Sequence, residues 1–175
     1  YKITRADGSP AHGGSGAWSL PTPPEMPGGW RAVEGSLVAC KQGLHLCRAR
    51  DLPSWRVENA VVWEAETPWG GERINAADKT VVRHARLRRR VGVLTSRVLR
   101  LFACDCAGHV LHLYERNYPG DTRPRDCIAV ARRLAMGDAT QEELDAAWAA
   151  AWAAASAAAR DAAWDAAWAA ARDSA

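Results

Sequence analysis

The sequence lacks the patterns that the common classes of enzyme require. It contains no G-x-S-x-G, no phosphate-binding loop, no glycine-rich dinucleotide turn and no pair of CxxC motifs. It also lacks a long apolar run. The alanine-rich stretch at 146–159 has fourteen uncharged residues, fewer than the roughly 20 that span a bilayer. We therefore expect no catalytic residues, no cofactor and no membrane span.

Cysteine and lysine are scarce. The five cysteines are an odd number without a repeating framework, which favours free thiols in a reducing cytoplasm. Three lysines stand against 20 arginines, a ratio typical of coding bias in a GC-rich bacterium or phage. Charge is unevenly spread: residues 140–175 have six acids and two arginines, a net of −4, so the rest carries +7. This split predicts a basic body with an acidic tail.

The first half alternates like a β-sheet protein. YKITR, residues 30–40, GLHLC and ENAVVWEAET are predicted strands, and KTVVRHARLRRRV is a predicted long strand after a turn-rich segment. A short helix is expected at ARDLPSW, with Asp51 as its N-cap. His12, among glycines, is expected to be solvated. Residues 1–94 are therefore predicted to be a small, mainly antiparallel β-sheet module.

The second half predicts three helices. Thr140 and Glu143 have the spacing of a capping box, Gly137 suits the end of the middle helix, and Pro124 suits its first turn. In the first helix an apolar stripe runs through Val98, Leu101, Phe102, Cys106, Val110 and Leu113. We expect this stripe to form the core. Residues 95–175 are predicted to be a helical module on which the sheet module packs, which gives an α+β fold overall.

A repeat with a period of four residues marks the last helix, in a background of alanine that favours helix to about residue 172. Its members are Leu144, Trp148, Trp152, Ser156, Arg160, Trp164, Trp168 and Arg172. Each step advances about 40° around the axis, so no single flat partner covers all four tryptophans. We expect Trp148 and Trp152 to lie in the core. Arg160, Trp164, Trp168 and Arg172 are predicted to bind a protein partner or a second copy.

Three further groups are candidates for chemistry. Cys104, Cys106, His109 and His112 have the chemistry of zinc ligands, but on a helix Cys104 and Cys106 point about 200° apart, so we expect no metal. Within the basic segment 79–100, Arg83, Arg86, Arg88 and Arg90 form a basic patch that predicts weak, salt-sensitive nucleic-acid binding, or a solvated strand face. His45, Glu64 and Glu66 are the polar groups placed to line a pocket.

Two resemblances rest on these residues. RLFACDCAGHVLHLYE and RPRDCIAVARRLAMGDATQEELDAAWAAAWAAA, within residues 100–155, resemble the putative immunity protein family of bacterial toxin–immunity systems and phages. Residues 30–92 resemble a phage-associated domain of unknown function through KQGLHLC, ARDLPSW and VVWEAE. The strand–helix–strand order around GLHLC also resembles part of the ADP-ribosyltransferase fold, without its catalytic motifs.

The sequence thus predicts a non-catalytic protein that binds another macromolecule, as an immunity or counter-defence factor of a bacterium or phage. Nucleic-acid binding through residues 79–100 is the second hypothesis. A degenerate ADP-ribosyltransferase-like enzyme is the third. The three hypotheses differ in what they need: an exposed apolar surface, a contiguous positive surface, or a cleft with converging polar groups.

Overall fold

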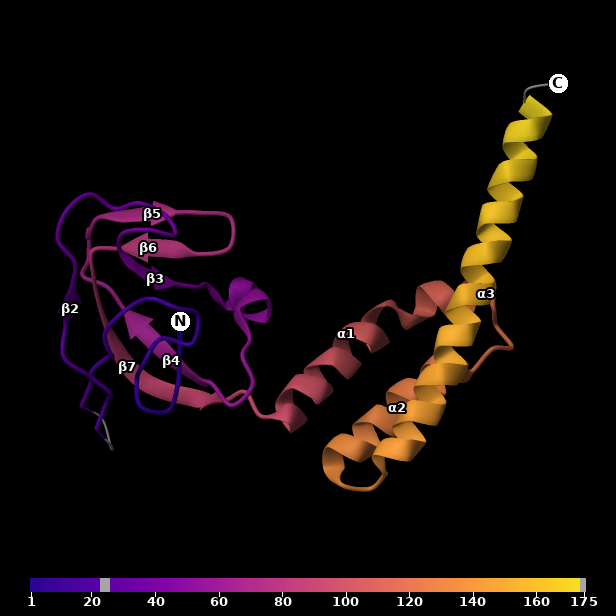
Figure 1. Cartoon of the computed structure of the whole chain (residues 1–175), viewed down its shortest axis with the longest axis horizontal. Helices are drawn as coiled ribbons and strands as arrows, with labels where there is room; N and C mark the ends of the chain where they lie inside the picture. The colour runs from indigo at the N-terminus through magenta and orange to yellow at the C-terminus, as the bar shows by residue number, and fades with distance from the viewer. Residues whose placement is uncertain (23–25, 174–175) are drawn as a thin grey trace. The chain divides into compact units, whose positions relative to one another are not determined.

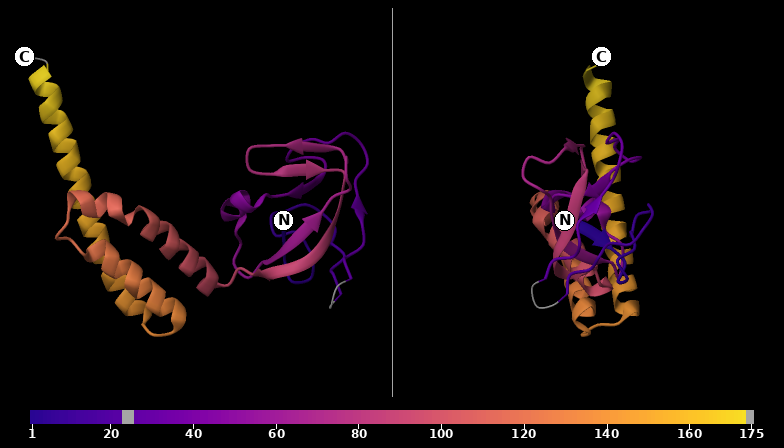
Figure 2. Two further views of the ribbon diagram at one scale, coloured as in Figure 1. Left: turned by 180° about the vertical axis from the view of Figure 1, so that it is seen from behind. Right: turned by 90° about the vertical axis from the view of Figure 1, so that its left-hand side faces the viewer.

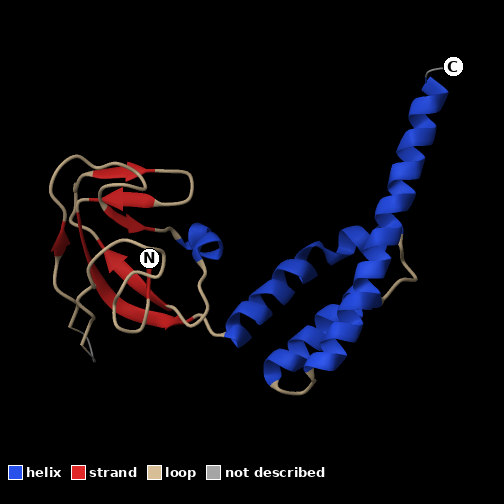
Figure 3. Cartoon of the chain, viewed as in Figure 1, coloured by secondary structure: helices blue, strands red, loops and turns tan. Residues whose placement is uncertain are grey.

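The chain is folded as two compact units. The computed structural model describes residues 1–22 and 26–173, with side chains as far as residue 167. One unit comprises Tyr1–Thr95 and the other Ser96–Ala175. Every strand of the described residues lies in the first unit, and the three α-helices lie in the second (Figure 3). The α+β class with antiparallel sheets is therefore confirmed.

The first unit contains two antiparallel sheets (Figure 1). One has the order β1-β4-β7-β2 and the other β3-β6-β5. The bounds of the four-stranded sheet are β1 Lys2–Thr4, β4 Val61–Glu66, β7 His84–Val93 and β2 Arg31–Ala32. Those of the three-stranded sheet are β3 Leu44–Leu46, β6 Thr80–Val82 and β5 Arg73–Asn75. A short 3-10 helix, η1, occupies Ala49–Trp55 between β3 and β4.

Alternation along β4 and β7 forms the core of this unit. Val61 and Trp63 point to the same side as Ala85 and Leu87, and all four are buried in one apolar cluster. The Trp63 indole N–H donates a hydrogen bond of 2.8 Å to the hydroxyl oxygen of buried Thr4. A buried indole needs such a partner, because an unpaired polar group inside a protein destabilises the fold.

Several predicted boundaries in this unit were wrong. The long strand expected from Lys79 is broken at Arg83 into β6 and β7, and β5 forms within the segment expected to be turns. Register shifts against β4 interrupt the alternation of β7, and Val91 within it is exposed. The N-cap of η1 is Arg48, because Asp51 instead accepts hydrogen bonds from the backbone and side chain of that arginine.

The second unit consists of α1 Ser96–Asn117, α2 Arg123–Met136 and α3 Gln141–Asp173. The predicted helix boundaries at its two turns are confirmed. The Glu143 N–H donates to Thr140 Oγ1 at 3.2 Å, and the Thr140 N–H donates to Glu143 Oε2 at 2.7 Å. Gly137 has a φ of 90°, the left-handed conformation that glycine adopts without strain, and ends α2.

Helix α2 packs against both α1 and α3. Ion pairs join α2 to its neighbours on each side: Arg132–Asp105 at 2.6 Å on α1, and Arg133–Glu143 at 3.3 Å on α3. The second half of α3 extends beyond α1 and α2 in both views of Figure 2. No helix of the described residues combines the length and apolarity of a membrane-spanning segment.

The predicted core faces of α1 and α3 were wrong. Phe102 and Leu113, expected to be buried, are exposed, and so are Trp148 and Trp152. The reason lies in which sides of the helices are covered: Cys104 of α1 and Ala154 of α3 are buried, as is Ala135 of α2. Close packing of helix backbones leaves the bulky side chains on the opposite faces.

Candidate functional site

Helix α1 has two apolar sides, of which only one is covered. Cys104, the buried residue of this helix, is 4% exposed, and its thiol lies 3.8 Å from the carbonyl oxygen of Ile128 on α2. At about 100° per residue, Phe102 and Leu113 lie about 160–180° around the helix from Cys104. We call the exposed side the α1 stripe. Its apolar members are Val98, Phe102, Val110 and Leu113.

Helix α3 shows the same division more sharply. Ala154 is 1% exposed, whereas Trp148 and Trp152 are 59% and 63% exposed. The two tryptophans lie about 120° and 160° around the helix from Ala154. Their rings stack on each other, with centroids 5.7 Å apart and planes inclined by 21°. This stacked pair, here the tryptophan face, is a preformed apolar surface on a rigid helix.

One acidic residue of α3, Asp145, lies on the side of the tryptophan face. Asp145 lies about 180° from Ala154, on the same side as Trp152. Its carboxylate accepts a hydrogen bond of 2.8 Å from Gln141, a neutral partner that leaves the negative charge uncompensated. The tryptophan face therefore combines two stacked rings with negative charge at one end.

The helical unit and the last residues of β7 match a family model. Residues 90–175 match the model of the Imm-5 like putative immunity protein family. No curated protein and no solved structure matches the chain. The family match confirms the resemblance predicted for residues 100–155. Nothing in the comparisons tests the phage-associated resemblance of residues 30–92.

The partner-binding surface predicted from the sequence lies nearer the C-terminus than the tryptophan face. Arg160 and Trp164 are both exposed, Trp164 by 66%. The side chains of Trp168 and Arg172 lie outside the described residues. Trp164 lies about 120° around the helix from Trp152, so the two do not share a face. The tryptophans of α3 thus present at least two separate surfaces.

The C-x-C-x-x-H-x-x-H segment also lies in the immunity-family region. Cys104 is buried, whereas Cys106, expected to lie on the buried stripe of this helix, is exposed. Burial raises the pKa of the Cys104 thiol, which disfavours the thiolate that zinc needs. His112 uses its Nδ1 in a contact of 3.1 Å with the carbonyl oxygen of His109. Among the described residues, no group of three or more potential ligands is arranged to hold a metal ion.

The basic patch of the first unit is partly neutralised by acids on neighbouring strands. Arg83 pairs with Glu72 at 2.5 Å, Arg86 pairs with Glu66, and Arg88 lies 3.5 Å from Glu64. Arg90, the fourth predicted member, has no ion pair among the described residues and is exposed. The guanidinium of Arg86 also lies 4.7 Å from the ring centroid of Trp30. These ion pairs and the cation–π contact hold most of the patch's arginine side chains in place on the strand face.

The predicted pocket residues separate in the structure. Glu64 and Glu66 pair with arginines of β7, Arg89 lying 2.5 Å from Glu64, because alternation places both acids on that face of the sheet. Neither lines the cavity at which His45 lies. That cavity has a volume of about 580 Å³ and is bounded by residues of the first unit alone. His45 therefore meets cations there rather than the two glutamates.

Sequence reasoning missed the cavity's other residues. His12, expected to be solvated, lies edge-on to the Trp55 ring, and its Nε2 is 2.5 Å from the Trp55 carbonyl oxygen. Lys2, Arg31 and Lys79 also border the cavity. No local signal in the sequence brings these residues together, because they come from four separate segments. The exposure of Trp148 could have been predicted from the sequence, because an alanine-rich inner face lets α3 pack closely without burying a tryptophan.

Proposed function

We propose that the immunity-family region neutralises a protein toxin by binding it directly through the tryptophan face and the α1 stripe. The observation that carries the proposal is the stacked pair Trp148–Trp152, which is more than half exposed on a helix whose inner face is alanine. Clustered exposed apolar side chains on a folded protein are typical of interaction sites.

The energetics favour a bound partner. Burying one large aromatic side chain contributes roughly 1.5–3 kcal/mol. Tryptophan is enriched among the residues that dominate binding energy in protein interfaces, partly because its large ring loses little conformational freedom. Because the stack already fixes both rings, less conformational entropy is lost when a partner binds them.

The charge around the tryptophan face selects the kind of partner. Asp145 and the net charge of −4 on residues 140–175 repel phosphate, which disfavours nucleic acid at this surface. The complementary surface is an apolar groove bordered by lysine or arginine. This groove-type recognition of an apolar helix face is a recurring mode of protein binding.

The test is co-expression of the full chain with each toxin candidate encoded beside its gene. The wild-type chain is expected to restore growth, and Trp148→Ala/Trp152→Ala is expected to lose rescue while keeping its helical circular dichroism. Trp69→Ala, which removes a fully exposed tryptophan from the first unit, is the matched control and is expected to keep full rescue.

Direct binding is then measured by calorimetry with a catalytically inactive toxin. The double variant is expected to bind at least about 30-fold more weakly, which corresponds to about 2 kcal/mol at one hot spot. Unchanged affinity and rescue in the double variant would overturn the proposed surface. If Trp164→Ala alone abolishes rescue, the surface lies on the C-terminal half of α3 and the assignment to Trp148 and Trp152 is wrong.

A further inference from the structure

The cavity of the first unit has a positive lining. Four cationic side chains border it, Lys2, Arg31, Lys41 and Lys79, and no aspartate or glutamate is among its lining residues. Its volume of about 580 Å³ lies within the range of small-molecule sites. Apolar residues, among them Val33, Leu44 and Trp18, lie along the remaining wall. The lining therefore combines an excess of positive charge with an apolar surface.

Two of the cations are held by an aromatic ring and by backbone carbonyls rather than by carboxylates. The Lys2 ammonium lies 5.5 Å from the ring centroid of buried Trp18 and donates to the His45 carbonyl oxygen at 3.2 Å. The Arg31 guanidinium lies 5.4 Å from the same ring and donates to the carbonyl oxygens of residues 15–17. Such contacts orient a cation without cancelling its charge.

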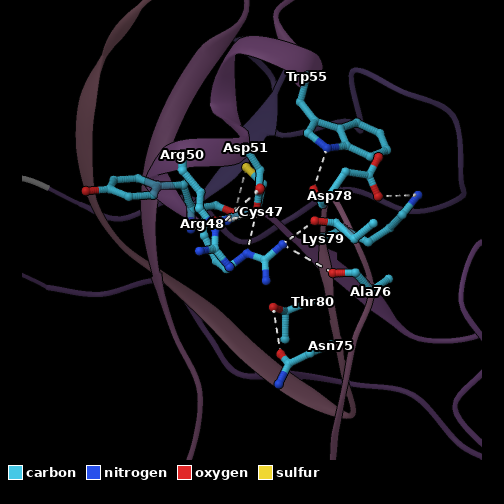
Figure 4. A network of polar contacts seen from close by, with 12 residues as sticks. Cys47, Arg48, Arg50, Asp51, Trp55, Asn75, Ala76, Asp78, Lys79 and Thr80 are labelled. Atoms are coloured by element: carbon cyan, nitrogen blue, oxygen red, sulfur yellow. Dashed lines mark hydrogen bonds and ion pairs between the residues drawn. The ribbon is translucent and has the colours of Figure 1, made fainter.

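Lys79 is also held by an aromatic ring. Its ammonium lies 4.6 Å from the ring centroid of Trp55 and donates to the Cys40 sulfur at 3.2 Å. Asp78, 3.5 Å away, offsets part of this charge. The Trp55 indole N–H is fixed by a hydrogen bond of 2.8 Å to the Asp78 carbonyl oxygen, and Figure 4 shows this bond beside Lys79.

The same close-up shows how η1 is anchored to the turn that carries Lys79. Arg48 donates to the carbonyl oxygens of Ala76 and Ala77 while pairing with Asp51 (Figure 4). Trp55 and Lys79 are thus held by contacts between two segments far apart in the sequence. A cationic group fixed in this way is preorganised for a ligand.

His45 lies among these cations as an uncharged group. The backbone N–H of Cys40 donates to its Nε2 at 3.0 Å, which assigns the ring proton to Nδ1. Burial lowers the pKa of His45, and the charges of Lys2 and Lys79 lower it further. Burial also lowers the pKa of Lys2, with a smaller contribution from Arg31. These cations therefore repel one another, and a bound anion would relieve that repulsion.

We propose that this cavity binds a nucleoside diphosphate or a closely similar small ligand, with its phosphates among Lys2, Arg31 and Lys79 and its ring against the apolar wall. Two or more negative charges match the excess of cations. A flat, weakly polar base matches the apolar side chains. The proposal concerns the first unit alone and does not rest on the toxin-binding role of the helical unit.

The test is calorimetric titration of the full chain with ADP and UDP, beside adenosine and pyrophosphate. The diphosphates are expected to bind with micromolar affinity, and adenosine and pyrophosphate each at least about tenfold more weakly, because each lacks one half of the ligand. The affinity of the diphosphates is expected to fall as salt concentration rises. No diphosphate binding up to about 1 mM, or equal binding of pyrophosphate alone, would overturn the proposal.

Variants locate the site. Lys79→Met and Arg31→Met are each expected to weaken ADP binding at least about tenfold, the loss expected for one charged contact to phosphate. Arg5→Met, which removes an exposed cation of the same unit outside the cavity, is the matched control and is expected to bind normally. Equal affinity of all three variants would place any binding elsewhere.

An alkylation experiment on the wild-type chain tests the site without relying on the folding of any variant. Cys40 borders the cavity and is exposed, and Cys106 is exposed on α1. Saturating ADP is expected to slow iodoacetamide modification of Cys40 at least about fivefold in the wild-type chain while Cys106 reacts at an unchanged rate, which serves as an internal control. An unchanged modification rate of Cys40, or equal protection of Cys40 and Cys106, contradicts a ligand in this cavity.

Discussion

The β-rich unit buries large apolar side chains in its core, whereas the buried residues of the helical unit are small and several of its large apolar side chains are exposed. Trp63 and Leu87 are buried between the strands of the first unit. Phe102, Trp148 and Trp152 are exposed in the second, which buries Cys104 and alanines instead. The difference follows from packing geometry: strands spaced about 4.8 Å apart interlock large side chains from a pleated face, while alanine-faced helices approach closely and exclude them.

The two units therefore offer recognition chemistry in different places. The first unit directs cations and aromatic rings into a cavity, and the second presents aromatic rings on a helix surface. A small anion suits the former and a protein groove suits the latter. Four substitutions or conditions test this contrast.

The largest expected effect is on the core of the β-rich unit. Leu87→Ala removes a side chain that is 0% exposed and should destabilise the unit by about 2–5 kcal/mol through lost burial and a cavity. Trp152→Ala is expected to cost less than about 1.5 kcal/mol, the stacking contribution of an exposed aromatic pair. Urea unfolding, with hydrogen exchange to separate the units, measures both. Comparable losses would mean that Trp152 belongs to a core.

The second effect concerns the alanine face of α3. Ala154→Leu inserts a larger side chain where α3 packs on α2, and should destabilise the helical unit by about 1–3 kcal/mol. The control is Ala153→Leu, one position away on an exposed site, where the change should stay within about 0.5 kcal/mol. Thermal unfolding followed at 222 nm measures the pair. Equal effects at both positions would show that the alanine face is not the packing surface.

A third, smaller effect is expected at the start of α3. Thr140→Ala removes one of the two reciprocal capping hydrogen bonds and should cost about 0.5–2 kcal/mol. Thr122, the N-cap of α2, makes no capping hydrogen bond, so Thr122→Ala should cost less. Denaturation midpoints of the two variants provide the measurement. The reverse order would contradict the contribution assigned to the capping box.

The smallest expected effect is a dependence of stability on pH in the β-rich unit. The pKa of His45 is lowered in the folded state by burial and by Lys2 and Lys79, so the unfolded chain binds the proton more readily. Stability should be unaffected by this group above the unfolded pKa of about 6.5 and should decrease as pH falls below it. Unfolding of the wild-type chain and His45→Gln at pH 7.5 and 5.5 measures the difference. An identical pH response in the variant would exclude His45 as the cause.

The helix boundaries of the second unit and most strands of the first followed from the sequence. The Thr140–Glu143 capping box and Gly137 involve neighbours within about four residues, so their spacing suffices to predict them. The β-prone run ENAVVWEAET predicted β4 for the same reason. The immunity-family resemblance was likewise carried by contiguous residues and was confirmed by the family match.

Tertiary structure alone decided which faces are buried and where the cations meet. Helix α1 has apolar residues on both the Cys104 side and the Phe102 side, and hydrophobicity does not choose between them; the close approach of α2 does. Lys2 and Lys79 lie at one cavity through pairing between distant strands, a result of chain topology that no local pattern encodes. Local hydrogen bonds and side-chain alternation are determined by neighbouring residues. Packing and electrostatic clustering depend on segments that only folding brings together.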